Sequence, residues 1–292
     1  MGQETGIAWT NHTANFWWGC QRVSPGCEHC YAEQLATTRR KLKVWGPPST
    51  TERLRMKGIW HDVPKWNTAA QRDGVRRRMF VSSMADVFEA HPQVEPWRAE
   101  ALALLERCTA LDVQLLTKRP ENVRAMVPPS WLTSWPSHVW IGTTVEDRKR
   151  AEQRIPHLLS VPAAVRFLSC EPLLERVSLQ AIGSDGQRGY DALSGIWRHD
   201  DGTPIEGAAS LGSIAWVIVG GESGSHARPF DLQWARTIVA QCASAGVACF
   251  VKQMGDEPWD GLLRQSFIAH HGADPSGWPL ELRVQEFPQV SP

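Results

Sequence analysis

Three cysteines that lie close together near the N-terminus could bind a metal. Cys20, Cys27 and Cys30 have the spacing C-x6-C-x2-C. Three thiolates from one loop can bind three irons of a 4Fe-4S cluster and leave the fourth iron open to a small molecule. The alternative is a closed structural zinc site with His29 as the fourth ligand. We favour the cluster, because these cysteines directly follow an expected strand, where barrel proteins place functional groups.

Further polar groups follow most of the other expected strands. Parallel strands bring their C-terminal ends to one edge of a sheet, so we expect these groups to gather there. Some have a structural alternative: a tight turn for the two glycines, a solvated rim or an ion pair for Lys118 and Arg119, a helix cap for Glu171, and a small core residue for Cys170. The candidates for ligand binding are Ser82, Ser83, Asp86, Lys118, Arg119, Thr143, Thr144, Glu146, Gly220 and Gly221. The candidates for catalysis are Cys170, Glu171, Glu222 and Lys252.

The elements that would position these groups alternate between strand and helix. Short apolar runs predict strands at 15–19, 79–83, 113–117, 139–143, 165–169, 216–220 and 248–252. Helical spacing predicts helices at 31–39, 97–108, 148–159 and 232–245. This order indicates an α/β protein, a partial (β/α) TIM-type barrel of about six or seven parallel strands.

We expect the barrel to occupy residues 1–255, followed by a C-terminal extension, 256–292, packed on it. Residues 178–212 are rich in Gly, Ser and Asp, which indicates an inserted loop or hairpin. Lys and Arg total 31, as do Asp and Glu, so no overall charge favours a nucleic acid or a membrane. No apolar run is long enough to span a bilayer, and no targeting segment is recognisable. We therefore expect a cytoplasmic protein with no membrane partner.

The segment Cys27-Glu28-His29-Cys30-Tyr31 resembles the second half of the radical S-adenosylmethionine (SAM) motif, C-x3-C-x2-C followed by an aromatic residue. The first gap departs from that motif, with six residues in place of three. The resemblance implies that SAM binds the open iron and is cleaved to a 5′-deoxyadenosyl radical, with Tyr31 beside the adenine.

The resemblance also implies roles for the strand ends. Radical SAM enzymes carry a Gly-Gly-Glu segment after the second strand, whereas Gly220-Gly221-Glu222 follows the sixth here. By position, Ser82, Ser83 and Asp86 are better placed for the amino group of SAM. Lys118 and Arg119 would meet its carboxylate or a substrate phosphate. The groups placed for its ribose are Thr143, Thr144 and Glu146.

A closer resemblance covers nearly the whole chain. The segments 18–33, 84–88, 115–120, 166–174, 216–229 and 250–255 resemble a phage-associated three-Cys-motif family of unknown function, whose members lie close to the spore photoproduct lyase-like radical SAM enzymes. This implies a radical SAM enzyme that modifies a nucleic-acid base or nucleotide and takes electrons from a flavodoxin or ferredoxin. Other members commonly have Ala in place of Cys170, which argues against an essential role for that thiol.

Two other functions fit the same residues. One is a non-catalytic iron-sulfur or zinc-bearing subunit for a partner protein encoded by a neighbouring phage gene. The other is an ordinary barrel enzyme that uses Lys118, Glu171 and Glu222 in acid–base chemistry.

Overall fold

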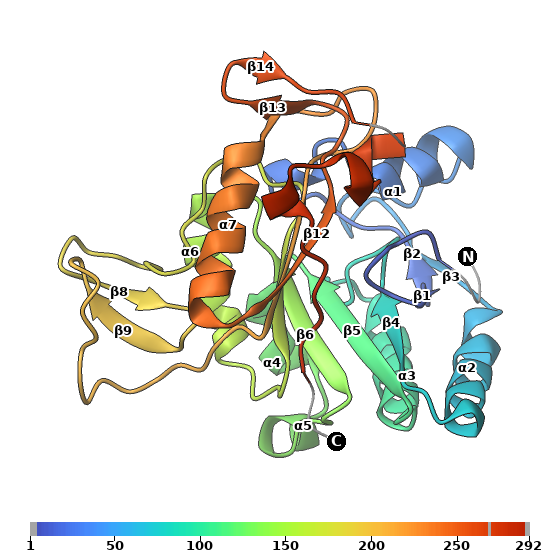
Figure 1. The fold of residues 1–292 in the computed structure, drawn as a ribbon. Helices are drawn as coiled ribbons and strands as arrows, with labels where there is room; N and C mark the ends of the chain where they lie inside the picture. The colour runs from blue at the N-terminus through green and yellow to red at the C-terminus, as the bar shows by residue number, and fades with distance from the viewer. Residues whose placement is uncertain (1–4, 268–269, 290–292) are drawn as a thin grey trace. The chain divides into compact units, whose positions relative to one another are not determined.

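The structure is a computed structural model, and it describes residues 5–267 and 270–289 (Figure 1). The chain divides into two compact units. Unit 1 comprises Met1–Gly142 and Val161–Ala164, and unit 2 comprises Thr143–Ser160 and Val165–Pro292.

Unit 1 is built on three neighbouring parallel strands. His12 lies opposite Met79, and Phe80 lies opposite Gln114, so residues in register share one face of the sheet. The strands are β1 (His12–Ala14), β4 (Arg77–Val81) and β5 (Leu111–Thr117). A short antiparallel ribbon joins β2 (Trp17–Trp18) to β3 (Leu54–Arg55).

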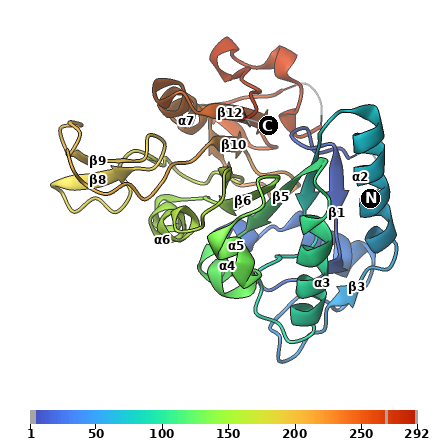
Figure 2. The same cartoon turned by 90° about the horizontal axis from the view of Figure 1, so that it is seen from below.

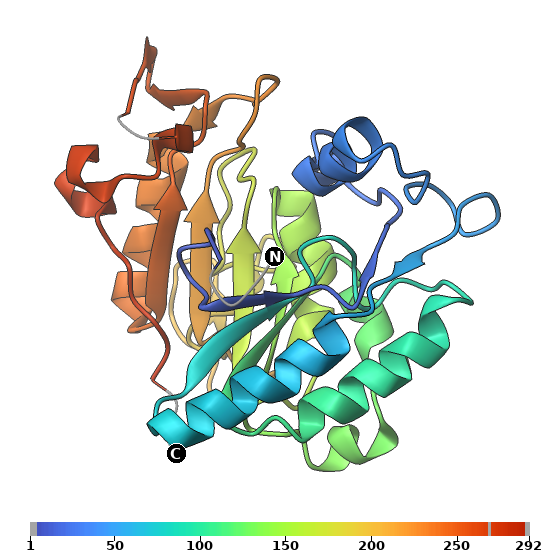
Figure 3. The ribbon, with the colours of Figure 1, turned by 90° about the vertical axis from the view of Figure 1, so that its right-hand side faces the viewer.

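Two long helices of unit 1, α2 (Ile59–Asp73) and α3 (Val94–Glu106), lie side by side (Figures 1 and 3). Trp66 of α2 stacks on His12 of β1, with 4.6 Å between ring centroids, so α2 packs against the sheet. The shorter helices of unit 1 are η1 (Pro25–Cys27), α1 (Tyr31–Gln34), the π-helical η2 (Leu35–Arg39), α4 (Pro120–Met126) and α5 (Pro129–Thr133).

Unit 2 also contains three neighbouring parallel strands, β7 (Arg166–Cys170), β10 (Trp216–Gly220) and β12 (Ala248–Gln253). Helix α7 (Leu232–Ala245) packs on β10 and β12. The carboxylate of Asp147 caps α6 (Arg148–Leu159), and that of Asp231 caps α7, which supplies an acceptor for the first free N–H groups of each helix.

The remaining elements of unit 2 are small. Strands β8 (Arg188–Asp191) and β9 (Ile196–His199) form a hairpin that extends away from the other strands of the unit (Figures 1 and 2). After α7 and β12, the backbone near Val284 hydrogen-bonds along β12 and covers its edge. The other short elements are β11 (Phe230–Asp231), β13 (Pro258–Asp260), β14 (Leu263–Arg264), η3 (His270–Gly272), η4 (Pro275–Gly277) and η5 (Leu280–Leu282).

Seven strands of the described chain form one sheet, in the order β1-β4-β5-β6-β7-β10-β12, with β6 at Val139–Thr144. The strands follow one another in chain order, and helices connect most of them. This is the βα topology of a TIM-type barrel that has fewer than eight strands. The predicted α/β fold, a partial barrel of six or seven parallel strands, is confirmed.

The predicted first strand, 15–19, is wrong. The first strand of the sheet is β1, and Trp17–Trp18 pair antiparallel with β3 instead. Asn15 follows β1, and its side-chain oxygen accepts the backbone N–H of Met84 at 2.8 Å. Helix α2 was not predicted, since polar residues and an internal Pro64 weaken its helical pattern.

Candidate functional site

Cys20 is fixed by its backbone in unit 1. Gly19 pairs with Ala85, and Cys20 pairs with Trp45, in two isolated parallel bridges. Gly19 has φ +116°, and a Cβ there would collide with the carbonyl oxygen of Val44. Only glycine suits that position, so the chain enters the cysteine loop along one defined path.

Cys27 and Cys30 lie further along the same loop. Cys27 ends η1, and Cys30 immediately precedes α1. Ala32 and Ala36 anchor the following helical turns in a small apolar cluster with Trp18 and Met84. This cluster ties the loop to the C-terminal end of β4.

The thiol of Cys20 contacts a buried arginine. Nη1 of Arg119 donates to its Sγ at 3.7 Å. Burial raises the pKa of Cys20 to about 12, although the positive charge of Arg119 opposes that rise. The free thiol is therefore protonated near neutral pH, and a metal must displace its proton to bind.

Asp86 holds Arg119 in place. Its Oδ2 accepts Nη1 of Arg119 at 2.8 Å and the backbone N–H of Lys118 at 3.0 Å. Its Oδ1 accepts the hydroxyl of Thr117 at 2.6 Å and the backbone N–H of Phe88 at 3.0 Å. Both carboxylate oxygens thus bind groups of the chain itself.

A second buried arginine lies behind this pair. Arg53 binds Glu89 through two hydrogen bonds of 2.9 and 2.8 Å, and both side chains are almost fully buried. Arg53 also donates to the carbonyl oxygens of Val44 and Gly46, which flank the partner of Cys20. Neither Arg53 nor Glu89 was predicted, because nothing in their spacing marks them.

Other positive and polar groups surround Cys30. Burial, the largest effect, raises the pKa of its thiol. The backbone N–H groups of Glu33 and Ala32 and the positive charge of Lys118 oppose that rise. Nearby, Arg22 pairs with Glu33 at 2.7 Å.

The predicted adenine and amino-group contacts also gather here. The hydroxyl of Tyr31 donates to the carbonyl oxygen of Ser83 at 3.1 Å, and more than half of the Tyr31 side chain is exposed. Asn15 donates to the hydroxyl of Ser83 at 3.0 Å, whereas the hydroxyl of Ser82 faces the carbonyl oxygen of Ala14. The structure thus brings Tyr31 and Ser83 together beside the cysteine loop, whereas the hydroxyl of Ser82 lies against β1.

The grouping of side chains bears on whether a single metal ion could bind. Within residues 5–267 and 270–289, no three or more His, Cys, Asp or Glu side chains are grouped so that they could hold a metal ion. The seven described cysteines are all free thiols; Cys20, Cys27 and Cys30 are half-buried and the other four are buried.

The predicted ribose contacts belong to a buried part of the chain. Thr143, Thr144 and Glu146 are at most 1 % exposed. Nη1 of Arg154 donates to Glu146 at 2.6 Å and to the carbonyl oxygen of Thr144 at 2.9 Å. These contacts join α6 to the end of β6.

The predicted catalytic groups of unit 2 form two separate ion pairs. Lys252 lies 3.0 Å from Glu171, and a Cβ on Gly220 would crowd that carboxylate. Glu222 binds Arg228 through its two oxygens, at 2.9 and 2.6 Å. Gly221 lets its backbone approach that of the residues following β12.

Cys170 lies in the core of unit 2 and is 0 % exposed. Burial raises the pKa of its thiol, with a further contribution from the neighbouring Cys249. Cys249 also contacts Cys242 of α7. The placement favours the structural role for Cys170.

One pair in unit 2 escaped prediction. Nδ1 of His271 lies 2.6 Å from Oδ2 of Asp256, and the same oxygen accepts the backbone N–H of Gly224 at 2.6 Å. The two residues lie in the C-terminal extension, where no periodic pattern marks them.

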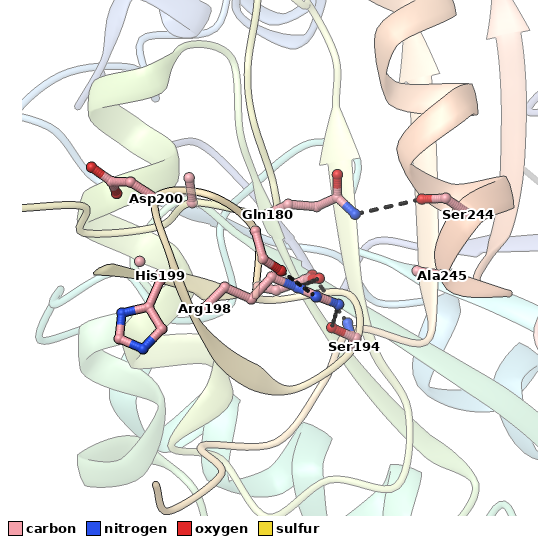
Figure 4. Close-up of a pocket in the computed structure, with 11 residues that line it drawn as sticks. Gln180, Ser194, Arg198, His199, Asp200, Ser244 and Ala245 are labelled. Carbon is pink, nitrogen blue, oxygen red and sulfur yellow. Dashed lines mark hydrogen bonds and ion pairs between the residues drawn. The ribbon is translucent and has the colours of Figure 1, made fainter. Parts of the chain in front are cut away.

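A cavity of about 560 Å³ lies between the β8–β9 hairpin and the end of α7, and Figure 4 shows the residues that line it. Gln180 donates to Ser244 at 3.5 Å across one side, and Arg198 reaches Ser194 on the other. None of the predicted site residues lines this cavity.

The fold and the strand ends define an α/β partial-barrel protein with a cysteine loop. Its sequence matches the family described as "Protein of unknown function (DUF5131)" over residues 4–280, so the chain belongs to that family. No curated protein and no solved structure matches it. Membership of an uncharacterised family is confirmed, whereas the phage association and the radical SAM relationship stay predictions. Across the described residues, no helix is long and apolar enough to cross a bilayer.

Proposed function

We propose that the protein is a radical SAM enzyme that binds a 4Fe-4S cluster through Cys20, Cys27 and Cys30. The observation that carries the proposal is the loop itself. Its three thiols are the half-buried cysteines of the described chain, and positive or N–H groups act on two of them. Such groups stabilise thiolate ligands.

The donor set fits a cluster better than a single ion. The ligands of a cluster bind separate iron atoms, so the thiols need not converge on one point. Cys20 is held by backbone pairing, while Cys27 and Cys30 lie on a short turn and a helix start. In this proposal Cys20 is the fixed ligand, and Cys27 and Cys30 bind the cluster from the loop that follows it.

When bound, the cluster would supply the electron that cleaves SAM. Among the residues of unit 1, Tyr31 is exposed enough to meet the adenine, and Lys118 carries a positive charge near Cys30 for the SAM carboxylate. Ser83, which lies beside Tyr31, has a hydroxyl that would meet the amino group of SAM. Asp86 would act indirectly, because it holds the side chain of Arg119 and the backbone of Lys118 in place.

The substrate in this proposal is a nucleic-acid base or nucleotide, and the electron donor is a cytoplasmic flavodoxin or ferredoxin. The resemblance to photoproduct lyase-like enzymes supports the substrate class by analogy alone. The balanced charge, 31 basic against 31 acidic residues, means that a nucleic acid would bind through a local patch.

The experiment is anaerobic turnover. The protein is reconstituted with iron and sulfide, reduced with dithionite and supplied with SAM, and 5′-deoxyadenosine is quantified by chromatography. We expect slow formation without substrate, and none from Cys27→Ser. A reconstituted cluster that yields no 5′-deoxyadenosine would contradict the proposal.

One observation favours a second function, a non-catalytic iron-sulfur or zinc-bearing subunit. Both oxygens of Asp86 and the guanidinium of Arg119 bind groups of the chain itself, which leaves fewer groups for SAM. That subunit would bind metal through the same cysteines but would show no affinity for SAM in calorimetry.

A further inference from the structure

Arg119 joins the thiol of Cys20 to the buried charge network of unit 1, which comprises Asp86, Glu89 and Arg53. Its side chain is 8 % exposed, and its contacts are all within the chain. Nη1 donates to Asp86 at 2.8 Å and to Sγ of Cys20 at 3.7 Å. Nη2 donates to the carbonyl oxygen of Gln21 at 2.8 Å and lies 3.8 Å from Glu89.

These contacts make Arg119 a poor ligand for a SAM carboxylate. A guanidinium binds a carboxylate best when two parallel N–H groups are presented to it. Here both terminal nitrogens already donate to groups of the chain. Lys118, whose ammonium lies near Cys30, is the better candidate for that contact.

The network also fixes where the guanidinium points. Asp86 holds one side of it, and Asp86 itself is held by Thr117 and two backbone N–H groups. Glu89, clamped by Arg53, provides a second negative charge behind it. Because the guanidinium is planar and two carboxylates hold it, Arg119 loses little additional side-chain entropy for each hydrogen bond that it forms.

We infer that Arg119 is a positioning residue for the Cys20 ligand, and that its N–H···S bond raises the reduction potential of the cluster. The inference rests on the proposed function. It adds a role for Arg119 that follows from its contact with Cys20 and not from the cysteine spacing. Hydrogen bonds to cluster sulfurs stabilise the reduced, more negative state and so raise the potential.

The test compares two buried arginines. Arg119→Lys keeps the positive charge beside Asp86 but shortens the reach to sulfur. Arg154→Lys makes the same change at Glu146, where Arg154 binds a carboxylate and a backbone carbonyl. The midpoint potential of each reconstituted protein is measured by a redox titration followed by electron paramagnetic resonance.

We expect a more negative midpoint potential for Arg119→Lys and the wild-type value for Arg154→Lys. Equal potentials in the wild type and Arg119→Lys would overturn the inference while leaving the proposed function standing. A wild-type protein that assembles no cluster would overturn both.

A second measurement covers the case in which Arg119→Lys does not fold. Wild-type protein labelled with guanidino-¹⁵N arginine is reconstituted and reduced, and electron–nuclear double resonance is recorded. We expect a ¹⁵N hyperfine coupling to the cluster. A cluster with no such coupling would overturn the inference.

Discussion

The strand ends of the two units use charged residues differently. In unit 2 each predicted carboxylate has its own cation: Glu146 binds Arg154, Glu171 binds Lys252, and Glu222 binds Arg228. In unit 1 one cation, Arg119, serves a carboxylate and a thiol together. A charged residue after a strand is therefore weak evidence for a ligand site, whereas a cation shared with a cysteine points to the chemistry of that cysteine.

The largest effect should come from the cysteine loop. Replacing Cys20, Cys27 or Cys30 with Ser removes a thiolate ligand, and iron content after reconstitution should fall from about four atoms per chain to near zero. Iron analysis and the absorption near 400 nm measure this. Cys108→Ala, at a buried cysteine outside the loop, is the control and should keep its iron. Full iron content in all three loop variants would show that these cysteines do not bind the iron, and the proposed distinction between unit 1 and unit 2 would then be lost.

The buried network of unit 1 should matter for stability. Glu89→Gln leaves the buried guanidinium of Arg53 without its carboxylate, so the free energy of unfolding should fall by about 3–5 kcal/mol. Urea denaturation of the apo protein measures it. Glu152→Gln is the control, because Glu152 pairs with Arg148 in solvent, and its free energy of unfolding should stay close to that of the wild type. Similar losses in both variants would show that the network is not specially stabilising.

The ion pair between Lys252 and Glu171 in unit 2 should contribute to the stability of the fold. Lys252→Met removes the cation beside the half-buried Glu171, and we expect the free energy of unfolding to fall by about 1–3 kcal/mol because that carboxylate loses its partner. Adding Glu171→Gln should recover part of that loss, as a double-mutant cycle would show. Strict additivity of the two changes would mean that the pair is not coupled.

The smallest effect is a pH dependence in the unit 1 core. Burial lowers the pKa of His138, whose Nε2 lies 3.0 Å from the carbonyl oxygen of Leu105. Below about pH 6.5 the unfolded chain binds a proton that the folded His138 resists, so stability is complete above that pH and falls as the pH drops. Urea midpoints from pH 8 to 5 should fall less steeply in His138→Gln. Identical slopes would show that His138 does not contribute.

Much of the fold could be predicted because its elements carry strong local patterns. The run Trp216–Gly220 is a continuous apolar strand, and Arg148–Leu159 and Leu232–Ala245 are helices with caps that the sequence displays. The prediction of the first strand failed because the tryptophans at 17–18 could pair either within the main sheet or, as they do, with β3. Only tertiary contacts, such as Asn15 with Met84, decide between them.

The site could be predicted only where residue type and spacing coincide. The cysteine spacing predicts a metal-binding loop, but the side chains that contact those thiols come from distant segments. Arg53 and Glu89 lie 36 residues apart in sequence, and only the fold brings them together. The same holds for Arg119, whose role follows from its contact with Cys20 rather than from its place at a strand end.

The central claim is that the cysteine loop of unit 1 holds a cluster with one iron open to SAM. The most direct measurement is electron paramagnetic resonance of the anaerobically reconstituted, reduced protein, recorded with and without SAM. The account predicts a 4Fe-4S signal that changes when SAM is added. A protein with no cluster, or with a cluster signal that SAM leaves unchanged, would contradict it.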